Sequence, residues 1–340
     1  MPKVAVVILN WNGREFLREF LPTVLKYSAN VAEVIIADNA STDSSLELLQ
    51  QNHPEVRIIQ NLTNGGFAKG YNDALSHIEA DYYVLLNSDI EVTENWISPV
   101  IKLMESDPLI AACQPKIMAF HDREMFEYAG AAGGFIDKYG YPFCRGRLFQ
   151  TLEKDHGQYD DVAEIFWATG ACMFVRADLY KKYGGLDQDF FAHMEEIDFC
   201  WRLKNEGYRI MYCPTSTVFH VGGGTLPKKS SLKTYLNMRN NIVLLYKNLP
   251  TNELLPVFIK RLLLDAIAAL KFMVDGGMSD FYAVFKAHTY FYRTYLRHRK
   301  KRKAIHQKPV SQIYRGNLVV DYFLRKRHLF SDLPGDRFKI

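Results

Sequence analysis

The sequence predicts an α/β protein: a Rossmann-like, mainly parallel central sheet flanked by helices, with a C-terminal helical extension. Two observations lead to this fold class. Up to about residue 118, short β-rich runs alternate with longer helical patterns, which is typical of βαβ units. From Ser231 to about Arg302 the hydrophobic periods are helical throughout. We therefore expect a domain over residues 1–248 and a helical, basic extension over residues 249–340.

The N-terminal part is expected to contain four strands separated by three helices. The strands are near-continuously apolar, as buried parallel strands should be, and are predicted at Val4–Leu9, Val34–Ala37, Val56–Gln60 and Tyr82–Leu86. The helices are predicted at Glu15–Lys26, Ser44–Gln51 and Ala68–Ile78. In such a sheet, ligands bind at the carboxyl ends of the strands, where the loops leave.

The second half of the domain is less regular. Residues 119–165 are rich in Gly, Tyr, Phe and Arg without a clean period, so we expect an irregular insertion there. Regular structure is predicted to resume at Ile165–Val175. A helix at Glu195–Asn205, ended by Gly207, and a strand at Tyr208–Cys213 are predicted to follow.

Composition favours a folded protein on the cytosolic side. The 340 residues are 48% hydrophobic and 24% charged, which is ordinary globular usage. Five cysteines without a C-x-x-C pair argue against a zinc knuckle or redox dithiol and suit reduced thiols. No signal peptide is apparent at the start. The longest apolar stretch, Leu262 to Val274, contains Asp265 and Lys271 and is too short to span a bilayer.

Charge is unevenly distributed along the chain. The net charge is +4, yet residues 281–330 hold 13 Lys or Arg against one acid, Asp321. An apolar stripe from Leu255 to Leu270, an aromatic run and the cluster Arg297–Lys303 follow one another. This order predicts a peripheral protein on the anionic inner face of the cytoplasmic membrane. The alternative is that these helices pack on the domain and leave a solvated basic face.

Four loops at the expected sheet edge carry polar groups that suit a nucleotide. Asp38 leaves its strand before the next helix, where a carboxylate can accept hydrogen bonds from a ribose or base. Asp43, a few residues later, is more typical of a helix cap. The candidate binding residues are Asn10, Asn12, Asp38, Asn39, Asn64, Gly66, Lys69, Asn87 and Ser88. The glycine-rich dinucleotide and P-loop motifs are both absent from the sequence.

Asp89 is a candidate ligand for a divalent cation. A carboxylate with an amide, Asn87, two residues earlier at a strand end suits Mg²⁺ or Mn²⁺, although Asn-Ser-Asp is also common turn chemistry. His220 ends a β-like run before Gly222, Gly223 and Gly224, with Lys228 and Lys229 beyond. An imidazole beside a glycine loop can close over a phosphate or a metal, whereas a lone His is more often structural.

A cluster of acids opens the helix predicted at Glu195–Asn205. Asp198 faces Arg202 at i,i+4, the spacing of a structural ion pair. Glu196 lies on another face, beside Phe199 and Cys200, and an apolar setting raises a carboxylate pKa and suits a general base. The alternative is a solvated acidic helix start favoured by the helix dipole.

Together these motifs resemble the inverting glycosyltransferases of family 2, which have the GT-A fold, and especially their rhamnosyltransferase-like bacterial branch. The resemblance covers about residues 3–248. The motifs that carry it are Asn10-Trp11-Asn12-Gly13, Asp38-Asn39-Ala40-Ser41-Thr42-Asp43, Asn64-Gly65-Gly66-Phe67, Asn87-Ser88-Asp89, Thr169-Gly170-Ala171, the acidic run from Glu195 to Arg202, and His220 with its glycines.

The resemblance implies a nucleoside-diphosphate sugar donor, a divalent cation held by Asp89 with His220, and Glu196 as the base. Glu195 and Asp198 remain alternatives for the base. Two positions depart from the family pattern: Asn87 stands where many relatives have Asp, and Glu196 stands where Asp is usual. Transfer to a saccharide or lipid-linked acceptor in bacterial cell-surface glycan synthesis is the implied function.

Other function classes have less support. A sugar-phosphate nucleotidyltransferase needs a basic, Gly-rich loop near the N-terminus, and here Asn10–Gly13 is followed only by Arg14. A nucleic-acid-binding protein fits the basic C-terminal region, but the motif-bearing loops lie elsewhere, so we expect no nucleic-acid partner. A catalytically inactive relative is the third alternative, which donor turnover would exclude.

Overall fold

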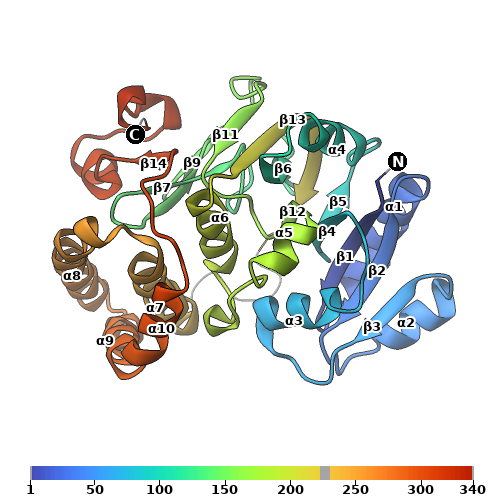
Figure 1. The fold of residues 1–340 in the computed structure, drawn as a ribbon, viewed down its shortest axis with the longest axis horizontal. Coiled ribbons are helices and arrows are strands. Elements are labelled where there is room, and N and C mark those ends of the chain that lie inside the picture. Colours follow the sequence, from blue (N-terminus) through green and yellow to red (C-terminus); the bar gives the residue numbers. More distant parts are fainter. Residues whose placement is uncertain (1, 223–229, 339–340) are drawn as a thin grey trace.

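A large mixed sheet forms the centre of the computed structural model, which describes residues 2–222 and 230–338 (Figure 1). Its strands are β1 (Val4–Asn10), β2 (Glu33–Asp38), β3 (Arg57–Gln60), β4 (Tyr82–Asn87), β5 (Ile90–Val92), β6 (Ile110–Ala119), β11 (Ala163–Ile165), β12 (Cys172–Arg176) and β13 (Arg209–His220). The strand order is β11-β13-β6-β12-β4-β1-β2-β3, with β5 paired to β13. β1 to β4 run parallel, whereas β12 lies antiparallel between β4 and β6.

Helices cover both faces of this sheet. They are α1 (Arg14–Ser28), α2 (Ser45–Asn52), α3 (Gly66–Leu75), α4 (Ser98–Glu105), α5 (Ala177–Lys182) and α6 (Glu195–Asn205). Alternate residues of β1 enter two different cores: Val4, Val6 and Ile8 pack with α1 and α4, and Ala5 and Val7 pack with α3 and α6. Burial on both faces explains the uninterrupted apolar runs of the sequence, and the predicted α/β class is confirmed.

The expectation of an irregular insertion at 119–165 is wrong. Much of this stretch forms a second, five-stranded sheet in the order β10-β9-β8-β7-β14. Its strands are β7 (Gly134–Asp137), β8 (Pro142–Cys144), β9 (Arg147–Leu148), β10 (Thr151–Leu152) and β14 (Ile313–Tyr314). Strands of two to four residues are too short to show a period, and β14 comes from the C-terminal part of the chain.

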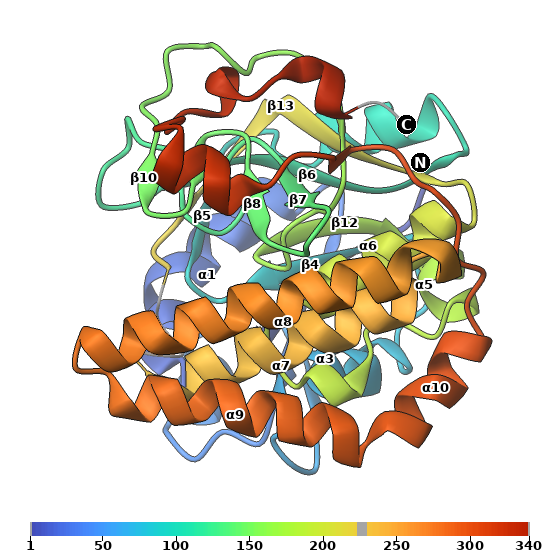
Figure 2. The same cartoon turned by 90° about the vertical axis from the view of Figure 1, so that its left-hand side faces the viewer.

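Four α-helices occupy residues 231–303, where the periodicity predicts helical structure. They are α7 (Ser231–Asn248), α8 (Thr251–Val274), α9 (Met278–Arg293) and α10 (Tyr295–Lys303). α7 lies between the sheet domain and the pair α8 and α9, which face the viewer in Figure 2. No helix in the described ranges is both long and apolar enough to cross a membrane. The division at residue 248 stays a prediction.

Candidate active site

Asn10 and Asp38 end the two central parallel strands and are hydrogen-bonded to each other. Asn10 Nδ2 donates to Asp38 Oδ1 at 3.2 Å, and the Ser41 amide donates to Asp38 Oδ2 at 3.0 Å. Asp38 is buried, so its carboxylate organises the loop after β2. Asn10 Oδ1 is buried and has no hydrogen-bond partner among the described residues. A Cβ on Gly13 would lie only 2.5 Å from that oxygen, so glycine leaves room there.

Asn39 connects the loop after β2 with the loop after β3. Its Nδ2 donates to Asn64 Oδ1 at 2.9 Å and to the Gly66 carbonyl at 3.2 Å. Gly66 opens α3 with φ +80°, and a Cβ there would collide with the ring of Phe191. Lys69 pairs with Asp73 one turn later on α3. Four of the predicted binding loops therefore meet at this edge, because Asn87 ends the neighbouring β4.

Asn12 and Ser88 also lie at this edge. Asn12 has φ +53°, and its side-chain oxygen accepts from the Thr42 amide at 2.7 Å and the Asp43 amide at 3.3 Å. Ser88 follows Asn87, and its hydroxyl would lie 3.3 Å from a Cβ placed on Gly13. These contacts tie the loops after β1, β2 and β4 into one surface.

His220 lies between two carboxylates. Its Nε2 is 3.2 Å from Asp89 Oδ1 and its Nδ1 is 3.3 Å from Glu127 Oε2, and all three residues are buried. Burial opposes the charged imidazole, but Glu127 and Asp89 outweigh it and raise the pKa of His220 to about 10. Burial likewise opposes a charged Asp89, yet His220 holds the pKa of Asp89 below its usual value. The Asn87 amide nitrogen Nδ2 approaches His220 Nε2 at 3.5 Å.

A divalent cation would find one ready donor here, the Asp89 carboxylate, and a second one in His220 Nε2 once that nitrogen has lost its proton. Within residues 2–222 and 230–338, no three His, Cys, Asp or Glu side chains are arranged to hold a metal ion. Asp89 and His220 nevertheless bring a carboxylate oxygen and an imidazole nitrogen together at the sheet edge. A carboxylate oxygen suits Mg²⁺ or Mn²⁺ when a ligand's oxygens and water complete the coordination. The glycines 223 and 224 and the lysines 228 and 229, predicted to close over this place, lie outside the described residues.

Glu195 and Glu196 open α6, and each has one buried carboxylate oxygen without a partner among the described residues. Glu195 Oε2 and Glu196 Oε2 are both buried and accept no hydrogen bond within the described parts of the chain. Burial raises the pKa of Glu196 to about 7, although nearby backbone amides act in the opposite direction. Burial, followed by the charge of Glu196, raises the pKa of Glu195 well above its usual value. Two adjacent carboxylates with raised pKa values are typical of a proton-transfer site.

Gly170 packs beside Glu196 near the polar edge of the sheet. A Cβ on Gly170 would lie 2.9 Å from the ring of Phe67 and 4.0 Å from Glu196 Cβ. The next residue, Ala171, accepts the Asn87 backbone amide at 2.9 Å. The turn at Thr169-Gly170-Ala171 therefore has Glu196 on one side and the loop of Asn87 on the other.

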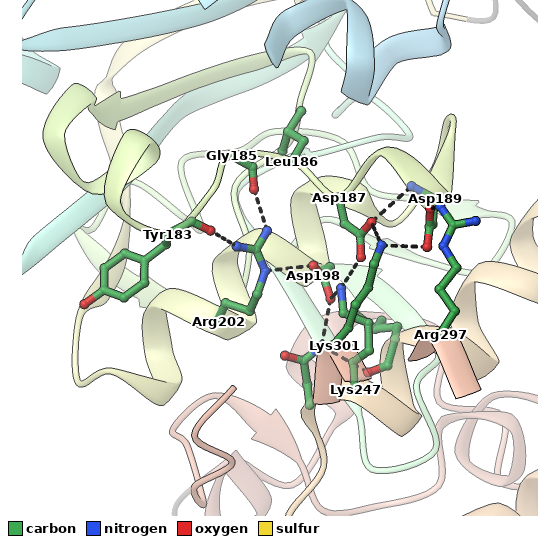
Figure 3. A network of polar contacts seen from close by, with 12 residues as sticks. Tyr183, Gly185, Leu186, Asp187, Asp189, Asp198, Arg202, Lys247, Arg297 and Lys301 are labelled. Carbon is green, nitrogen blue, oxygen red and sulfur yellow. Dashed lines mark hydrogen bonds and ion pairs between the residues drawn. The ribbon is translucent and has the colours of Figure 1, made fainter. Parts of the chain in front are cut away.

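Asp198 has a different environment from Glu196. It is fully buried, and it accepts from Arg202 Nε and Asn248 Nδ2, each at 2.9 Å, and pairs with Lys247 at 2.8 Å (Figure 3). Burial opposes its charge, but Lys247 and Arg202 outweigh burial and lower the pKa of Asp198. The ion pair with Arg202 expected from the i,i+4 spacing is confirmed.

Comparison with known proteins identifies the family. Residues 5–184, more than half of the chain, match the family described as "Glycosyl transferase family 2". The chain belongs to glycosyltransferase family 2. The resemblance drawn from the loop motifs is thereby confirmed at the level of the family.

Relatives of this glycosyltransferase act in glycan synthesis. An N-acetylglucosaminyl-diphospho-decaprenol L-rhamnosyltransferase of Mycobacterium tuberculosis is 24% identical over 233 residues, covering 63% of this chain and 75% of the relative. Among solved structures, GalNAc-T7 with UDP, GalNAc and Mn²⁺ is similar with a TM-score of 0.59 at 16% identity, covering 74% of this chain and 49% of that one. The mannosyltransferase PcManGT of Pyrobaculum calidifontis, with GDP-Man and Mn²⁺, has a TM-score of 0.52 at 14% identity, covering 96% and 88%. These structures confirm the GT-A-like fold.

Sequence reasoning missed the second carboxylate beside His220 in this glycosyltransferase. Glu127 lies in the stretch without a clean period, and nothing in the local sequence distinguishes it from the other acidic residues of the chain. It also missed Asp187 and Asp189, which precede α6 and pair with cations of α7 and α10. The aspartates are 60 to 114 residues away from these cations, so no local spacing could have indicated the pairs.

Proposed function

We propose that this glycosyltransferase moves a sugar, of the hexosyl or rhamnosyl type, from a nucleoside-diphosphate sugar to an acceptor hydroxyl with inversion. The observation that carries the proposal is the carboxyl of Glu196. Its buried Oε2 has no partner among the described residues, its pKa is about 7, and it lies beside Gly170 at the edge where the polar loops meet. A carboxylate with that pKa is ionised in part at neutral pH and is basic enough to take a hydroxyl proton.

In this mechanism, Glu196 accepts the proton of the acceptor hydroxyl as the hydroxyl oxygen attacks the anomeric carbon. The bond between that carbon and the diphosphate oxygen breaks on the opposite face, so one displacement inverts the configuration. No second carboxylate needs to form a covalent sugar intermediate. Asp198 is unsuited to the base role because its oxygens are held by Arg202, Asn248 and Lys247.

The donor is proposed to bind along the polar edge formed by the loops after β1 to β4. Asn10, Asn12, Asp38, Asn39, Asn64, Gly66, Lys69, Asn87 and Ser88 are the proposed contacts. The unpartnered Asn10 Oδ1 is available to a ligand donor, whereas Asp38 is proposed to act mainly by fixing the loop. UDP and GDP-Man, named as bound in the two similar structures, support a nucleotide ligand for a protein of this fold.

Asp89 and His220 are the residues proposed to hold Mg²⁺ or Mn²⁺. A divalent cation there supplies positive charge beside the oxygens of the departing diphosphate. Glu127 then fixes His220 from the side away from Asp89, since the two carboxylates approach different ring nitrogens.

Donor turnover tests this proposal. Purified protein is incubated with UDP-, GDP- and dTDP-linked sugars and Mn²⁺, and released nucleoside diphosphate is measured. We expect release from one donor class, abolished by excess chelator and by Asp89→Ala. Unchanged release in chelator would overturn the metal assignment. Absence of release from every donor, with and without saccharide acceptors, would contradict the transferase proposal.

We further propose that the protein works at an anionic membrane surface on a lipid-linked acceptor. The decaprenol acceptor in the name of the mycobacterial relative supports this, and so does a broad apolar surface on α8 and α9. The α8 part of this surface consists of large side chains that are 52 to 82% exposed: Leu255, Ile259, Leu263, Ile267, Leu270 and Val274. Tyr282, Phe285 and Tyr292 extend it onto α9, with exposures of 55 to 61%.

Exposed cations border this apolar surface. Lys260 on α8 and Lys286 and Arg293 on α9 are all exposed, and lysine or arginine near an anionic leaflet contributes about 1 kcal/mol each. The cluster at Arg297–Lys303 contributes less than its composition suggests. Arg297 and Lys301 pair with aspartates of the domain, and Arg302 donates to backbone carbonyls of α7 and its C-terminal turn.

Vesicle co-sedimentation tests the membrane proposal. We expect binding to vesicles with phosphatidylglycerol but not to purely zwitterionic vesicles, weakened by Leu263→Asp with Ile267→Asp and by high salt. Leu62→Asp, at a 98% exposed position far from α8 in sequence, is the matched control and should bind like the wild type. Equal sedimentation with both vesicle types would contradict the proposal. So would a stable dimer that the α8 variant dissociates without any vesicle binding.

A further inference from the structure

The segment before α6 has an unusual backbone. Between α5 and α6 the chain passes through the short helical turn η1 (Gln188–Phe190) and then through Phe191, His193 and Met194. These three residues have φ values of +63°, +69° and +74°. Non-glycine residues with positive φ are unfavourable, and three within four positions persist only where surrounding contacts fix them. Glu195 and Glu196 follow immediately, so this segment, residues 187–194, sets where α6 begins.

One side of the segment 187–194 contacts the start of α3, at the polar edge of the sheet. The Phe67 amide, at the start of α3, donates to the Phe191 carbonyl at 2.8 Å. The Phe191 ring covers Gly66, since a Cβ on that glycine would lie 2.5 Å from it. The same segment therefore joins the polar edge of the sheet to the helix that carries Glu196.

The other side of the segment is held by α7. Asn240 Nδ2 faces the carbonyl oxygens of Phe190, Ala192 and His193 at 3.0, 2.8 and 2.7 Å. Arg239 Nη2 donates to the carbonyls of Asp189 and Phe190 at 3.0 and 2.7 Å. α7 thus supplies hydrogen-bond donors to the part of the loop whose carbonyls cannot pair within regular structure.

Cations of α7 and α10 hold the aspartates of the segment (Figure 3). Lys301 Nζ of α10 lies 2.6 Å from Asp189 Oδ2 and also pairs with Asp187, while Arg297 pairs with Asp189. Lys247 of α7 bridges Asp187 at 2.5 Å and Asp198 of α6 at 2.8 Å. The side chains of Asp187 and Asp189 are only 8% and 4% exposed, so these pairs are weakly screened by solvent.

We propose that Lys301 is a positioning residue that clamps Asp187 and Asp189 and thereby holds the left-handed turn that aims Glu196 at the transfer site. The contacts of Lys301 with Asp187 and Asp189 support the clamp itself, while its effect on catalysis rests on the proposed role of Glu196. Without Lys301, Asp189 keeps Arg297, Asp187 keeps Lys247, and the Asp189 amide still donates to Asp187 Oδ1 at 3.0 Å. Among the described residues, however, no other cation bridges the two carboxylates. In this proposal, the C-terminal helix α10 contributes to catalysis without contacting the substrate.

Hydrogen exchange tests the clamp independently of any substrate. Amides of Phe190, Phe191 and Ala192 donate to carbonyls within the segment, so their exchange reports whether the turn stays formed. In Lys301→Gln we expect residues 187–194 to exchange at least tenfold faster than in the wild type. Lys300→Gln, a neighbouring exposed position on the same helix, is the matched control and should exchange like the wild type. Lys301→Arg should restore most of the protection, because it keeps the positive charge.

Steady-state kinetics with the nucleotide sugar found in the donor panel test the catalytic consequence. We expect Lys301→Gln to lower kcat about tenfold and leave the donor KM within twofold, with Lys301→Arg restoring kcat. Exchange as slow in Lys301→Gln as in Lys300→Gln would overturn the clamp. Faster exchange with unchanged kcat would overturn the positioning role alone. Failure of every donor would count against the proposed function, and the exchange result would still decide the clamp.

Discussion

Two sets of carboxylates lie within twelve residues of each other and have opposite surroundings. Asp187, Asp189 and Asp198 are paired with lysine and arginine side chains from α6, α7 and α10. Glu195 and Glu196, on the same helix as Asp198, each have a buried oxygen without a partner in the described structure. The neighbouring cations lower the pKa of Asp187 and Asp198 against the effect of burial, whereas burial raises the pKa of both glutamates.

The two sets of carboxylates therefore suit different roles: the paired aspartates stabilise the fold, whereas the two glutamates suit proton transfer. A carboxylate bonded to fixed cations is a poor base because its charge is already stabilised, and it contributes to folding instead. A carboxylate buried without a partner costs stability and gains basicity, a combination that proteins retain at reactive positions. Both kinds of carboxylate occur within one turn of α6, because Glu196 and Asp198 are two residues apart and point to different faces of the helix.

The largest expected effect separates the two sets by activity. Glu196→Gln keeps the side-chain shape but cannot accept a proton, so kcat should fall at least about 100-fold with donor KM little changed. Initial rates of nucleoside diphosphate release, with folding checked by circular dichroism, measure this. Glu195→Gln, next to it on α6, is the comparison variant. A greater loss of kcat in Glu195→Gln than in Glu196→Gln, at equal stability, would move the base to Glu195.

The second expected effect concerns stability. Asp198→Asn removes the charge that Arg202 and Lys247 share, and removing one partner of a buried ion pair costs about 3 kcal/mol. Urea unfolding at neutral pH should show this loss of unfolding free energy for Asp198→Asn and none for Glu196→Gln. Equal stability of the two variants would show that the surroundings of these carboxylates differ less than the contacts indicate.

The same contrast shows how far the sequence could predict the structure. The strands β1 to β4 were predicted within two residues at their ends because buried parallel strands are uninterrupted apolar runs. The predicted bounds of α6 coincide with the observed ones, and the Asp198–Arg202 pair follows from a spacing within one helix. Local patterns were thus sufficient for the elements and for one of the ion pairs.

Contacts between distant segments could not be predicted. Lys301 looked like part of an exposed basic cluster, yet it lies 112 residues from its partner Asp189 and points toward the domain. Glu127 beside His220, and β14 beside β7, depend in the same way on how remote parts of the chain meet. Residue type and spacing indicated Glu196 as a candidate base, but which acids are neutralised depends on tertiary packing.

The third expected effect is on the pH dependence of the rate. Only ionised Glu196 can accept a proton, and its pKa is about 7, so kcat should fall about tenfold per pH unit below that value. Asp198 has a lowered pKa and should remain ionised throughout this range. Rates measured from pH 5.5 to 8.5 at saturating donor would show this fall of kcat at low pH. A rate that stays constant down to pH 5.5 would instead mean that the base has an ordinary, solvent-exposed carboxylate pKa.

The last expected effect is a pH-dependent gain in stability on removing the charge of Glu196. The unfolded pKa of a glutamate is about 4.3 and the folded pKa of Glu196 is about 7, so the folded state binds more protons between these values. Stability therefore falls as pH rises from about 4 to 7, and the full penalty is present above pH 7. Glu196→Gln lacks this penalty. It should be more stable than the wild type by about 4 kcal/mol at pH 8, with the difference vanishing near pH 4.

Urea unfolding of the wild type and Glu196→Gln at pH 4, 6 and 8 measures this difference. Asp198→Asn provides the opposite control: its loss relative to the wild type should persist at pH 8, because a carboxylate with a lowered pKa stabilises the fold above its unfolded pKa. A Glu196→Gln variant that is less stable than the wild type at pH 8 would mean that the carboxylate has a stabilising partner. It would then belong with the aspartates that hold the fold.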